Sequence, residues 1–395
     1  MRFIIILLLA VVFGSVNAQP YQIGHTTITL IDSSRSNRSI PTEIYYPADV
    51  AGNNVPVTSS TSAKFPLISF GHGFVMTWDA YQNIWEAVVP EGFIIAFPKT
   101  ETGISPSHSE FGKDLAFVIA QMNQLNFLGS SLFFNRIDSM NCVMGHSMGG
   151  GAAFLAAELD SSIKTLATLA PAETNPSAIN AASALLLPSL IMAGGNDCVT
   201  PPVTNQIPMY DSLQSNCKSY ISINGGSHCQ MAETNFLCSF GEATCTPQPT
   251  ISRADQHLVI NRYLLPWLNY QLKGDCISGT QFDSLIAIDA SINYHKTCIL
   301  CPVTTSVEDK NYSNVEVYPN PFSDKITIKL NQQGLNYLKV LILRMDGVIV
   351  HSSDFGVVKG NDKLIVELNK SLPSGIYLIN LWIEGKVITR KIVKR

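Results

Sequence analysis

Charged residues are scarce in this chain. Asp, Glu, Lys and Arg make up 14% of its 395 residues, whereas apolar residues make up 46%. Disordered chains have the opposite balance, so the sequence predicts a folded protein. The formal net charge of −4 provides no global basic field, which excludes a general nucleic-acid-binding function. The sequence also has no internal repeat and no low-complexity tract.

Long apolar runs are missing except near the first residue. There, Arg2 precedes the apolar run Phe3–Gly14, which is well short of the roughly 20 residues that a membrane-spanning helix needs. Val16-Asn17-Ala18 follows with the small-x-small pattern of a cleavage site. The sequence therefore predicts a secretory signal peptide over residues 1–18, export of the protein, and no transmembrane segment.

Cysteine is missing before Cys142 and after Cys301, but nine cysteines lie in that range. An exported chain can keep disulfides. Cys142 lies in an apolar stretch and is predicted to be a buried free thiol, which leaves eight cysteines for four bridges of open pairing. Cys298-Ile-Leu-Cys301 has no second CxxC and no suitably spaced histidine pair beside it. One disulfide or two separate bridges are expected there, rather than a metal site.

Charge and periodicity divide the chain into parts. Residues 316–395 hold 12 Lys and Arg against 7 Asp and Glu, whereas the remainder holds 14 against 23. Up to Leu272, short extended runs alternate with helix-like runs, which is typical of an α/β fold with a mostly parallel sheet and helices on both faces. We expect an α/β catalytic domain at 19–274, a linker at 275–314 and a third part at 315–395. Seven short β-like runs in this third part predict a small all-β sandwich.

Gly145-His146-Ser147-Met148-Gly149 matches the G-x-S-x-G motif and lies between an expected strand and an expected helix. In such a nucleophile elbow a tight strand-to-helix turn exposes the serine hydroxyl, and the flanking glycines avoid clashes. The helix that begins behind the serine offers backbone N–H groups to a developing oxyanion. Ser147 is therefore the predicted nucleophile.

A serine nucleophile needs an adjacent base that a carboxylate orients, and in α/β-hydrolases the chain order is serine, acid, histidine. Asp197 follows an expected strand at 187–193, and His228 follows another at 219–223. Each residue lies in a loop at the end of a strand, in the required order. We predict a catalytic triad of Ser147, Asp197 and His228.

Two backbone amides are expected to stabilise the oxyanion. One belongs to Met148, directly after the nucleophile, and the other to Phe74, in the loop after an early strand. The side chains of Phe74 and Met148 are expected to form an apolar shelf for a substrate acyl or aromatic group. His146 is expected to support the elbow rather than to act as a second base.

These motifs, with Tyr210-Asp211-Ser212, resemble the secreted polyesterase–lipase–cutinase family, which includes bacterial PET-hydrolase-like enzymes. The resemblance covers roughly Phe65–Leu272 and implies an α/β-hydrolase with the same triad and oxyanion donors. It also implies a cystine between the acid and histidine loops, for which Cys198 and Cys229 are candidates. The segment around Phe74 and Trp78 is equally similar to chlorophyllase-like and acetylhydrolase-like enzymes, and Trp78 is a further candidate for substrate binding.

The chain departs from the polyester-cleaving members in two places. Many of those members carry an aromatic residue after Ala-Pro, where this chain reads Ala170-Pro171-Ala172-Glu173. The segment Cys229–Pro249 resembles an insertion beside His228. Both departures bear on polyester cleavage and leave ester hydrolysis untouched.

The last part of the chain has a resemblance of its own. The segments Val317–Phe322 and Leu372–Tyr377 and the basic end Lys391–Arg395 are similar to the type IX secretion C-terminal sorting domain. The resemblance implies export across the outer membrane by the type IX machinery, and a secreted or cell-surface location. A sugar-binding or adhesive β-sandwich is the alternative for this domain.

Together these observations predict an exported, monomeric serine hydrolase that cleaves a small-molecule or polymeric carboxylic ester through an acyl-enzyme. No metal or organic cofactor is expected. Within the hydrolases, the alternatives are a polyester hydrolase and a lipase. The alternative from another class is a non-catalytic cell-surface binding protein on a hydrolase scaffold.

Overall fold

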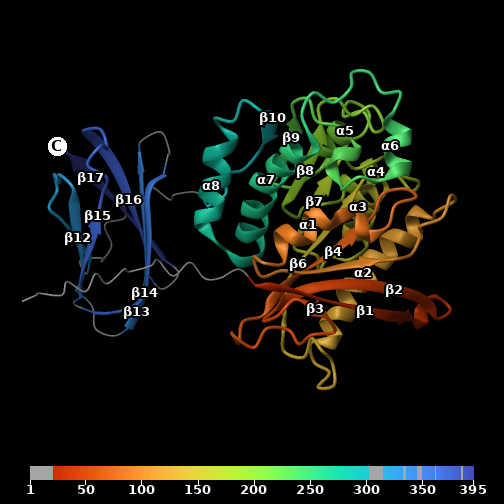
Figure 1. The fold of residues 1–395 in the computed structure, drawn as a ribbon, viewed down its shortest axis with the longest axis horizontal. Coiled ribbons are helices and arrows are strands. Elements are labelled where there is room, and N and C mark those ends of the chain that lie inside the picture. The colour runs from red at the N-terminus through yellow and green to blue at the C-terminus, as the bar shows by residue number, and fades with distance from the viewer. Residues whose placement is uncertain (1–20, 302–314, 332–334, 345–348, 361, 384–385) are drawn as a thin grey trace, which may run out of the picture. The chain divides into compact units, whose positions relative to one another are not determined.

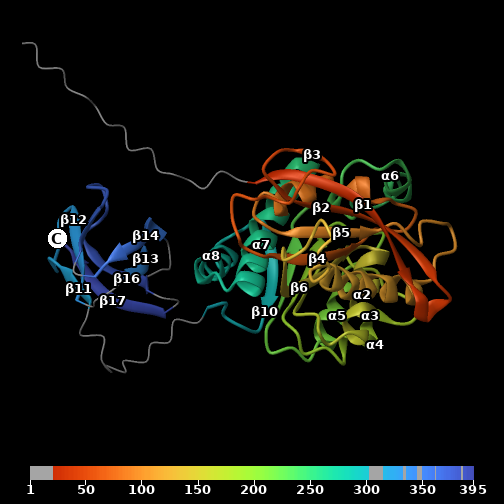
Figure 2. The same ribbon diagram turned by 90° about the horizontal axis from the view of Figure 1, so that it is seen from below.

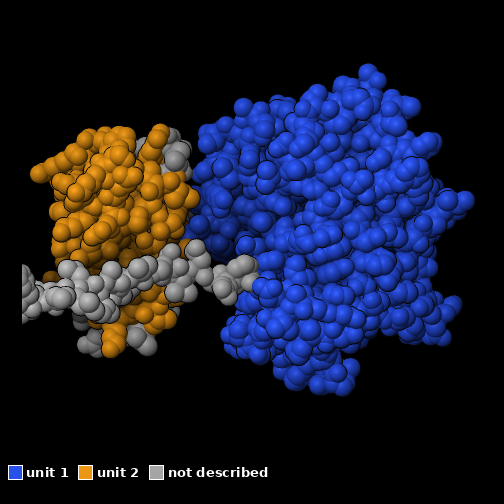
Figure 3. All heavy atoms as spheres, viewed as in Figure 1, with its two compact units in different colours: residues 1–301 blue, residues 302–395 orange. Residues whose placement is uncertain are grey.

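The structure is a computed structural model, and it divides into two compact units, one ending at Cys301 and one after it (Figure 3). It describes residues 21–301, 315–331, 335–344, 349–360, 362–383 and 386–395. The predicted signal peptide and residues 302–314 of the expected linker lie outside the described residues. Within these ranges, no helix is long and apolar enough to cross a bilayer.

The first unit is built on a ten-stranded sheet in the order β10-β9-β8-β7-β6-β4-β5-β2-β1-β3 (Figure 1). From β5 to β9 all neighbours pair in parallel, and antiparallel pairing is confined to β1–β2, β2–β5 and β9–β10. The strands are β1 Gln22–Asp32, β2 Arg38–Ala48, β3 Gly52–Asn53, β4 Phe65–Gly71, β5 Ile94–Pro98, β6 Ile137–His146, β7 Thr165–Leu169, β8 Ser189–Gly194, β9 Lys218–Ile223 and β10 Ile292–Lys296.

Helices cover both faces of this sheet, and Figure 2 shows α2 to α5 grouped together. Neighbouring residues of one strand enter different cores because side chains alternate across a sheet. Leu67 packs in the core beneath α2 to α5, and Ile68 packs in the core beneath α1, α7 and α8. The helices are α1 Gln82–Val88, α2 His108–Leu125, α3 Met148–Leu159, α4 Ala178–Ala182, α5 Gln206–Ser212, α6 Phe236–Glu242, α7 Arg253–Lys273 and α8 Cys276–Ile286. The predicted α/β fold class is confirmed.

The expectation of a linker at 275–314 is wrong for its first part, because residues up to Cys301 belong to the first unit. Helix α7 ends at Lys273 and is capped by Gly274, which adopts φ 66°, and α8 begins two residues later at Cys276. The α8 residue Phe282 is fully buried in the core beside α7, and β10 pairs with β9. Weak periodicity concealed α8 because only part of its surface is buried.

Cys142 is a buried free thiol, as predicted, and the other eight cysteines form four disulfides. The pairs are Cys198–Cys245, Cys229–Cys238, Cys217–Cys298 and Cys276–Cys301. The CxxC cysteines thus belong to two separate bridges. The pairing of Cys198 with Cys229 is wrong, because each of the two is bonded instead to a different cysteine of the inserted segment, Cys245 and Cys238 respectively.

The second unit contains two antiparallel sheets around one core, in the orders β11-β12-β15 and β14-β13-β16-β17. Ile326 and Ile328 of one sheet and Val340 and Ile379 of the other are fully buried in that core. This confirms the predicted all-β fold. The strands are β11 Val315–Tyr318, β12 Lys325–Leu330, β13 Leu335–Arg344, β14 Ile349–Lys359, β15 Lys363–Glu367, β16 Gly375–Ile383 and β17 Lys386–Lys394.

Candidate active site

Ser147 lies in the tight turn between β6 and α3. Its backbone has φ 55° and ψ −123°, a conformation that costs free energy in a non-glycine residue and is typical of functional sites. Its N–H donates to Leu169 O over 3.0 Å, and its carbonyl accepts from Gly151 N and Ala172 N. A Cβ at Gly149 would lie 2.2 Å from the backbone of Gly71, so the elbow requires glycine there. The predicted strand–turn–helix context of Ser147 is present.

Asp197 and His228 form a buried pair. Asp197 Oδ2 lies 2.8 Å from His228 Nδ1, and the side chains of the two residues are 0% and 2% exposed. Asp197 follows β8, and its Oδ1 accepts from Thr200 N, which holds the carboxylate in place. A carboxylate can only accept, so His228 Nδ1 carries the proton and Nε2 presents a lone pair. This is the tautomer that a general base requires.

The elbow and the histidine loop are joined through His146, the residue before Ser147. His146 Nε2 lies 3.2 Å from His228 O, and the two imidazole centroids are 4.7 Å apart. No hydrogen bond between Ser147 and His228 is present in the described part of the chain. Burial lowers the pKa of His146 well below its ordinary value, with a further contribution from His228, so His146 is neutral. As expected for a supporting residue, its donor is committed to the His228 carbonyl.

A directional chain of hydrogen bonds runs from the loop after β4 to His228. Because the carbonyl of His228 can only accept, His146 Nε2 carries its proton and Nδ1 accepts. The Tyr81 hydroxyl lies 3.0 Å from His146 Nδ1 and accepts from Gly73 N over 2.7 Å. Burial raises the pKa of Tyr81, so the hydroxyl keeps its proton and donates it to His146. These hydrogen bonds thereby fix the loop after β4, the nucleophile elbow and the His228 loop relative to one another.

The residues predicted for the oxyanion hole and for substrate contact lie in different environments. Phe74 follows β4, and its side chain is 48% exposed. Met148 is the first residue of α3, so its amide has no partner within the helix, but its side chain is buried in the core. Trp78 starts a 3-10 helix, and Lys99 Nζ lies 4.1 Å from its ring centroid. Substrate contact by Phe74, Met148 and Trp78 stays a prediction.

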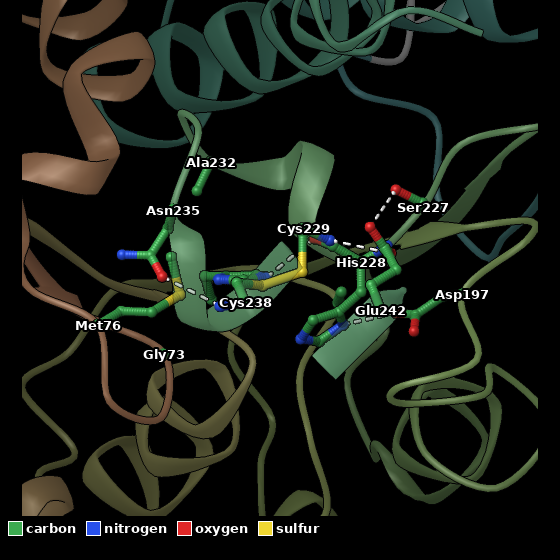
Figure 4. The surroundings of a disulfide bond; sticks show 12 residues. Gly73, Met76, Asp197, Ser227, His228, Cys229, Ala232, Asn235, Cys238 and Glu242 are labelled. Carbon is green, nitrogen blue, oxygen red and sulfur yellow. Dashed lines mark hydrogen bonds and ion pairs between the residues drawn. A yellow bond between two sulfur atoms is a disulfide. The ribbon is translucent and has the colours of Figure 1, made fainter. Parts of the chain in front are cut away.

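Two polar residues beside His228 were not predicted from the sequence. Thr200 Oγ1 lies 3.0 Å from His228 Nδ1 and donates to Asp197 Oδ2 over 2.9 Å. Glu242 of α6 accepts from His228 N over 2.7 Å (Figure 4). A threonine three residues after the acid is a local signal for the first. Nothing in the sequence singles out Glu242 except its position between two cysteines. In the described ranges, no group of three or more potential metal ligands is present.

Comparisons with known proteins identify the family of the first unit. A family model described as PET hydrolase-like matches residues 15–243. Similar proteins include cutinase 1 of Thermobifida cellulosilytica, 27% identical over 228 residues that cover 53% of this chain and 79% of the relative. Another is the bis(hydroxyethyl) terephthalate hydrolase of Streptomyces coelicolor, 25% identical over 211 residues that cover 53% of this chain and 61% of the relative.

The second unit matches a different family. The model of the secretion system C-terminal sorting domain matches residues 316–395, nearly the whole of that unit. This domain marks proteins that the type IX system secretes, so the protein is exported. The match to the hydrolase family lies in the first unit and covers more than half of the chain, so the first unit is the hydrolase part. The chain belongs to the PET hydrolase-like family of carboxylic ester hydrolases, joined to a secretion system C-terminal sorting domain.

Proposed function

We propose that the protein hydrolyses carboxylic esters with Ser147 as nucleophile, His228 as general base and Asp197 as the carboxylate that orients the base. The observation that carries the proposal is the buried Asp197–His228 pair, 2.8 Å apart, next to a strained serine elbow. Burial of a carboxylate and an imidazole costs free energy, and a proton-transfer role accounts for that cost. The strained backbone of Ser147 also costs free energy, and a catalytic role accounts for that cost.

In the proposed reaction, His228 Nε2 takes the Ser147 hydroxyl proton as the oxygen attacks the ester carbonyl carbon. The amides of Phe74 and Met148 donate to the resulting oxyanion. His228 then returns the proton to the leaving alcohol, and Ser147 keeps the acyl group. Water hydrolyses this ester by the same steps, which regenerates the enzyme. The Ser147–His228 hydrogen bond, which the described part of the chain does not contain, forms when substrate is in place.

The assignment of Ser147 is tested with Ser147→Ala. We expect kcat for a p-nitrophenyl ester to fall by about four orders of magnitude or more, because the nucleophile is lost while the fold remains. Ser139 is exposed on β6, the strand that precedes Ser147, and provides the matched control. Ser139→Ala should retain wild-type kcat. An unchanged rate in Ser147→Ala would refute the assignment.

The substrate class is proposed from the surroundings of Ser147. Phe74, whose amide is the proposed second oxyanion donor, has an exposed ring that could contact an acyl or aromatic group of the substrate. Ala172 follows Ala170-Pro171, where the resemblance drawn from the sequence leads us to expect an aromatic residue in many polyester-cleaving members, and its amide is bonded to the Ser147 carbonyl. We therefore propose hydrolysis of small or short-chain esters, with polyester hydrolysis, suggested by the cutinase relatives, as the second candidate. A series of acyl chain lengths, followed by a polyester film, separates the two.

A further inference from the structure

We infer that Glu242 is a positioning residue for His228, and that the inserted segment 229–249 serves to hold it there. The inference rests on the proposed role of His228 as general base. Glu242 lies at the end of α6 and is 9% exposed. It is far from Asp197 in sequence, and neither the triad geometry nor the family match assigns it a role.

The Glu242 carboxylate binds three consecutive residues of the histidine loop. Oε1 accepts from His228 N over 2.7 Å and from Cys229 N over 3.2 Å, and Oε2 accepts from Ser227 Oγ over 3.1 Å. Figure 4 shows Glu242 beside Ser227 and His228, with Asp197 near the imidazole. Within the described chain, no basic side chain forms an ion pair with Glu242. Arg253 interacts with Glu242 beyond ion-pair distance, and the hydrogen bonds of the carboxylate go to the loop that carries His228.

Disulfides tie the inserted segment to both partners of the catalytic pair. Cys229, next to His228, is bonded to Cys238 of α6, four residues before Glu242. Cys198, next to Asp197, is bonded to Cys245, three residues after Glu242. Residues four apart on a helix share a face, so Cys238 and Glu242 both point to the histidine loop. The segment around Glu242 is thus covalently attached on either side.

The other face of α6 shows that the helix is not placed there to bury apolar surface. Phe236 and Phe240 are 80% and 74% exposed, and Leu237 is 50% exposed. A helix that packs for stability turns such side chains inward. Here the inward face carries the carboxylate instead, which indicates that contact with the His228 loop is what the inserted segment provides.

Glu242 has two effects on His228. Its hydrogen bonds fix the backbone from which the imidazole projects, opposite Gln256 of α7, which bonds Ser227 N and O. Its negative charge also favours the imidazolium that forms during proton transfer. Two charged or titratable groups besides Glu242 lie beside the imidazole, namely Asp197 and the neutral His146. At the start of α7, Arg253 donates to the carbonyls of Cys229 and Ala232, and it interacts electrostatically with Glu233, which lies near His257.

The test compares Glu242→Ala, Glu242→Gln and Glu242→Asp in the full chain, with a p-nitrophenyl ester between pH 5 and 9. We expect Glu242→Ala to lower kcat about tenfold or more with KM nearly unchanged, because the base is misplaced. Glu242→Gln keeps an acceptor but loses the charge, so the acid limb of its pH–rate profile should move to lower pH. Glu242→Asp should recover part of the rate and the wild-type acid limb.

Glu233, the other carboxylate of the inserted segment, provides the matched control, because its side chain is 41% exposed and lies near His257. Glu233→Gln should leave kcat and the acid limb unchanged. The inference is overturned if the Glu242 variants keep the wild-type kcat and profile, or if Glu233→Gln shifts the profile equally. A wild-type enzyme with no esterase activity would contradict the proposed function itself. An active wild-type enzyme whose Glu242 variants are unchanged would contradict only the role of Glu242. Thermal unfolding and labelling of Ser147 by a fluorophosphonate identify any variant that does not fold.

Discussion

His228 is held at three of its polar atoms by three different parts of the fold. Nδ1 meets Asp197, the backbone N–H donates to Glu242, and the carbonyl accepts from His146. Among the described residues none bonds Nε2, the nitrogen that receives the Ser147 proton in the proposed reaction. An imidazole restrained in this way loses little conformational freedom when it acts, which is the basis of preorganised catalysis.

The hydrogen-bond chain through Tyr81 gives a test at the residue scale. Tyr81→Phe keeps the buried ring but removes the acceptor of Gly73 N and the donor to His146 Nδ1. We expect kcat to fall several-fold, because the loop of the proposed oxyanion donor loosens, and the free energy of unfolding to fall by about 1–2 kcal/mol. Steady-state kinetics and urea unfolding measure both. Tyr294→Phe, at a partly exposed tyrosine, is the control. A wild-type kcat in Tyr81→Phe would contradict the role of the hydrogen-bond chain through Tyr81.

Asp289 gives a pH-dependent test. Burial alone would raise its pKa, but hydrogen bonds from Ser291, Tyr263 and Arg262 outweigh burial and lower the pKa to about 2. Since the folded-state pKa lies below the unfolded value, Asp289 stabilises the fold above about pH 4, and this contribution is lost as the pH falls towards 2.

Asp289→Asn should therefore reduce the free energy of unfolding at pH 7 by about 1 kcal/mol, a value discounted for solvent screening. The difference from wild type should shrink as the pH is lowered to 3, as measured by urea unfolding at each pH. Asp211→Asn, at an exposed carboxylate, should show little difference at either pH. A pH-independent effect of Asp289→Asn would disagree with the lowered pKa.

At the scale of elements, the disulfides differ in what they hold. Cys198–Cys245 ties the Asp197 loop to the inserted segment, whereas Cys276–Cys301 ties α8 to the end of the first unit. Removing either pair by double Cys→Ser substitution should destabilise the protein by about 2–4 kcal/mol. Only the Cys198/Cys245 variant should also lower kcat, by severalfold, because Asp197 orients the base. Equal kcat in the two folded variants would contradict this distinction.

The strands, and the strand ends at which the proposed triad residues lie, could be predicted because their signals are local. Each central strand is a short apolar run, and Ser147, Asp197 and His228 each follow one. Helix α8 and the disulfide pairing could not, because they depend on which segments meet in space. Glu242 escaped for the same reason: a carboxylate bonded to backbone N–H groups leaves no spacing pattern in the sequence. Thr200 was within reach, since it stands three residues after Asp197.

At the scale of the whole molecule, two units with separate cores serve two purposes. The first unit buries its own apolar residues on both faces of one sheet, and the second forms a core between its two sheets. The family matches divide the chain in the same way, into a hydrolase and a secretion system sorting domain. The basic charge of residues 316–395 belongs to the second unit, whereas every residue of the proposed mechanism lies in the first.

A chain that ends at Cys301 should therefore fold and keep the wild-type kcat for a p-nitrophenyl ester, because every residue of the proposed mechanism and all four disulfides precede that point. The same chain, expressed in a host with a type IX system, should fail to reach the medium. Kinetics and cell fractionation measure the two outcomes. Loss of activity on truncation would show that the second unit contributes to the hydrolase.

The proposed mechanism depends on Ser147 as the nucleophile that His228 activates. The most direct measurement is covalent labelling of the full chain with a fluorophosphonate, followed by peptide mass spectrometry and an esterase assay on the same sample. We predict one adduct per chain, on Ser147, with esterase activity lost in proportion to labelling, and no adduct in Ser147→Ala or His228→Ala. An adduct on another residue, or full activity in the labelled protein, would contradict the account.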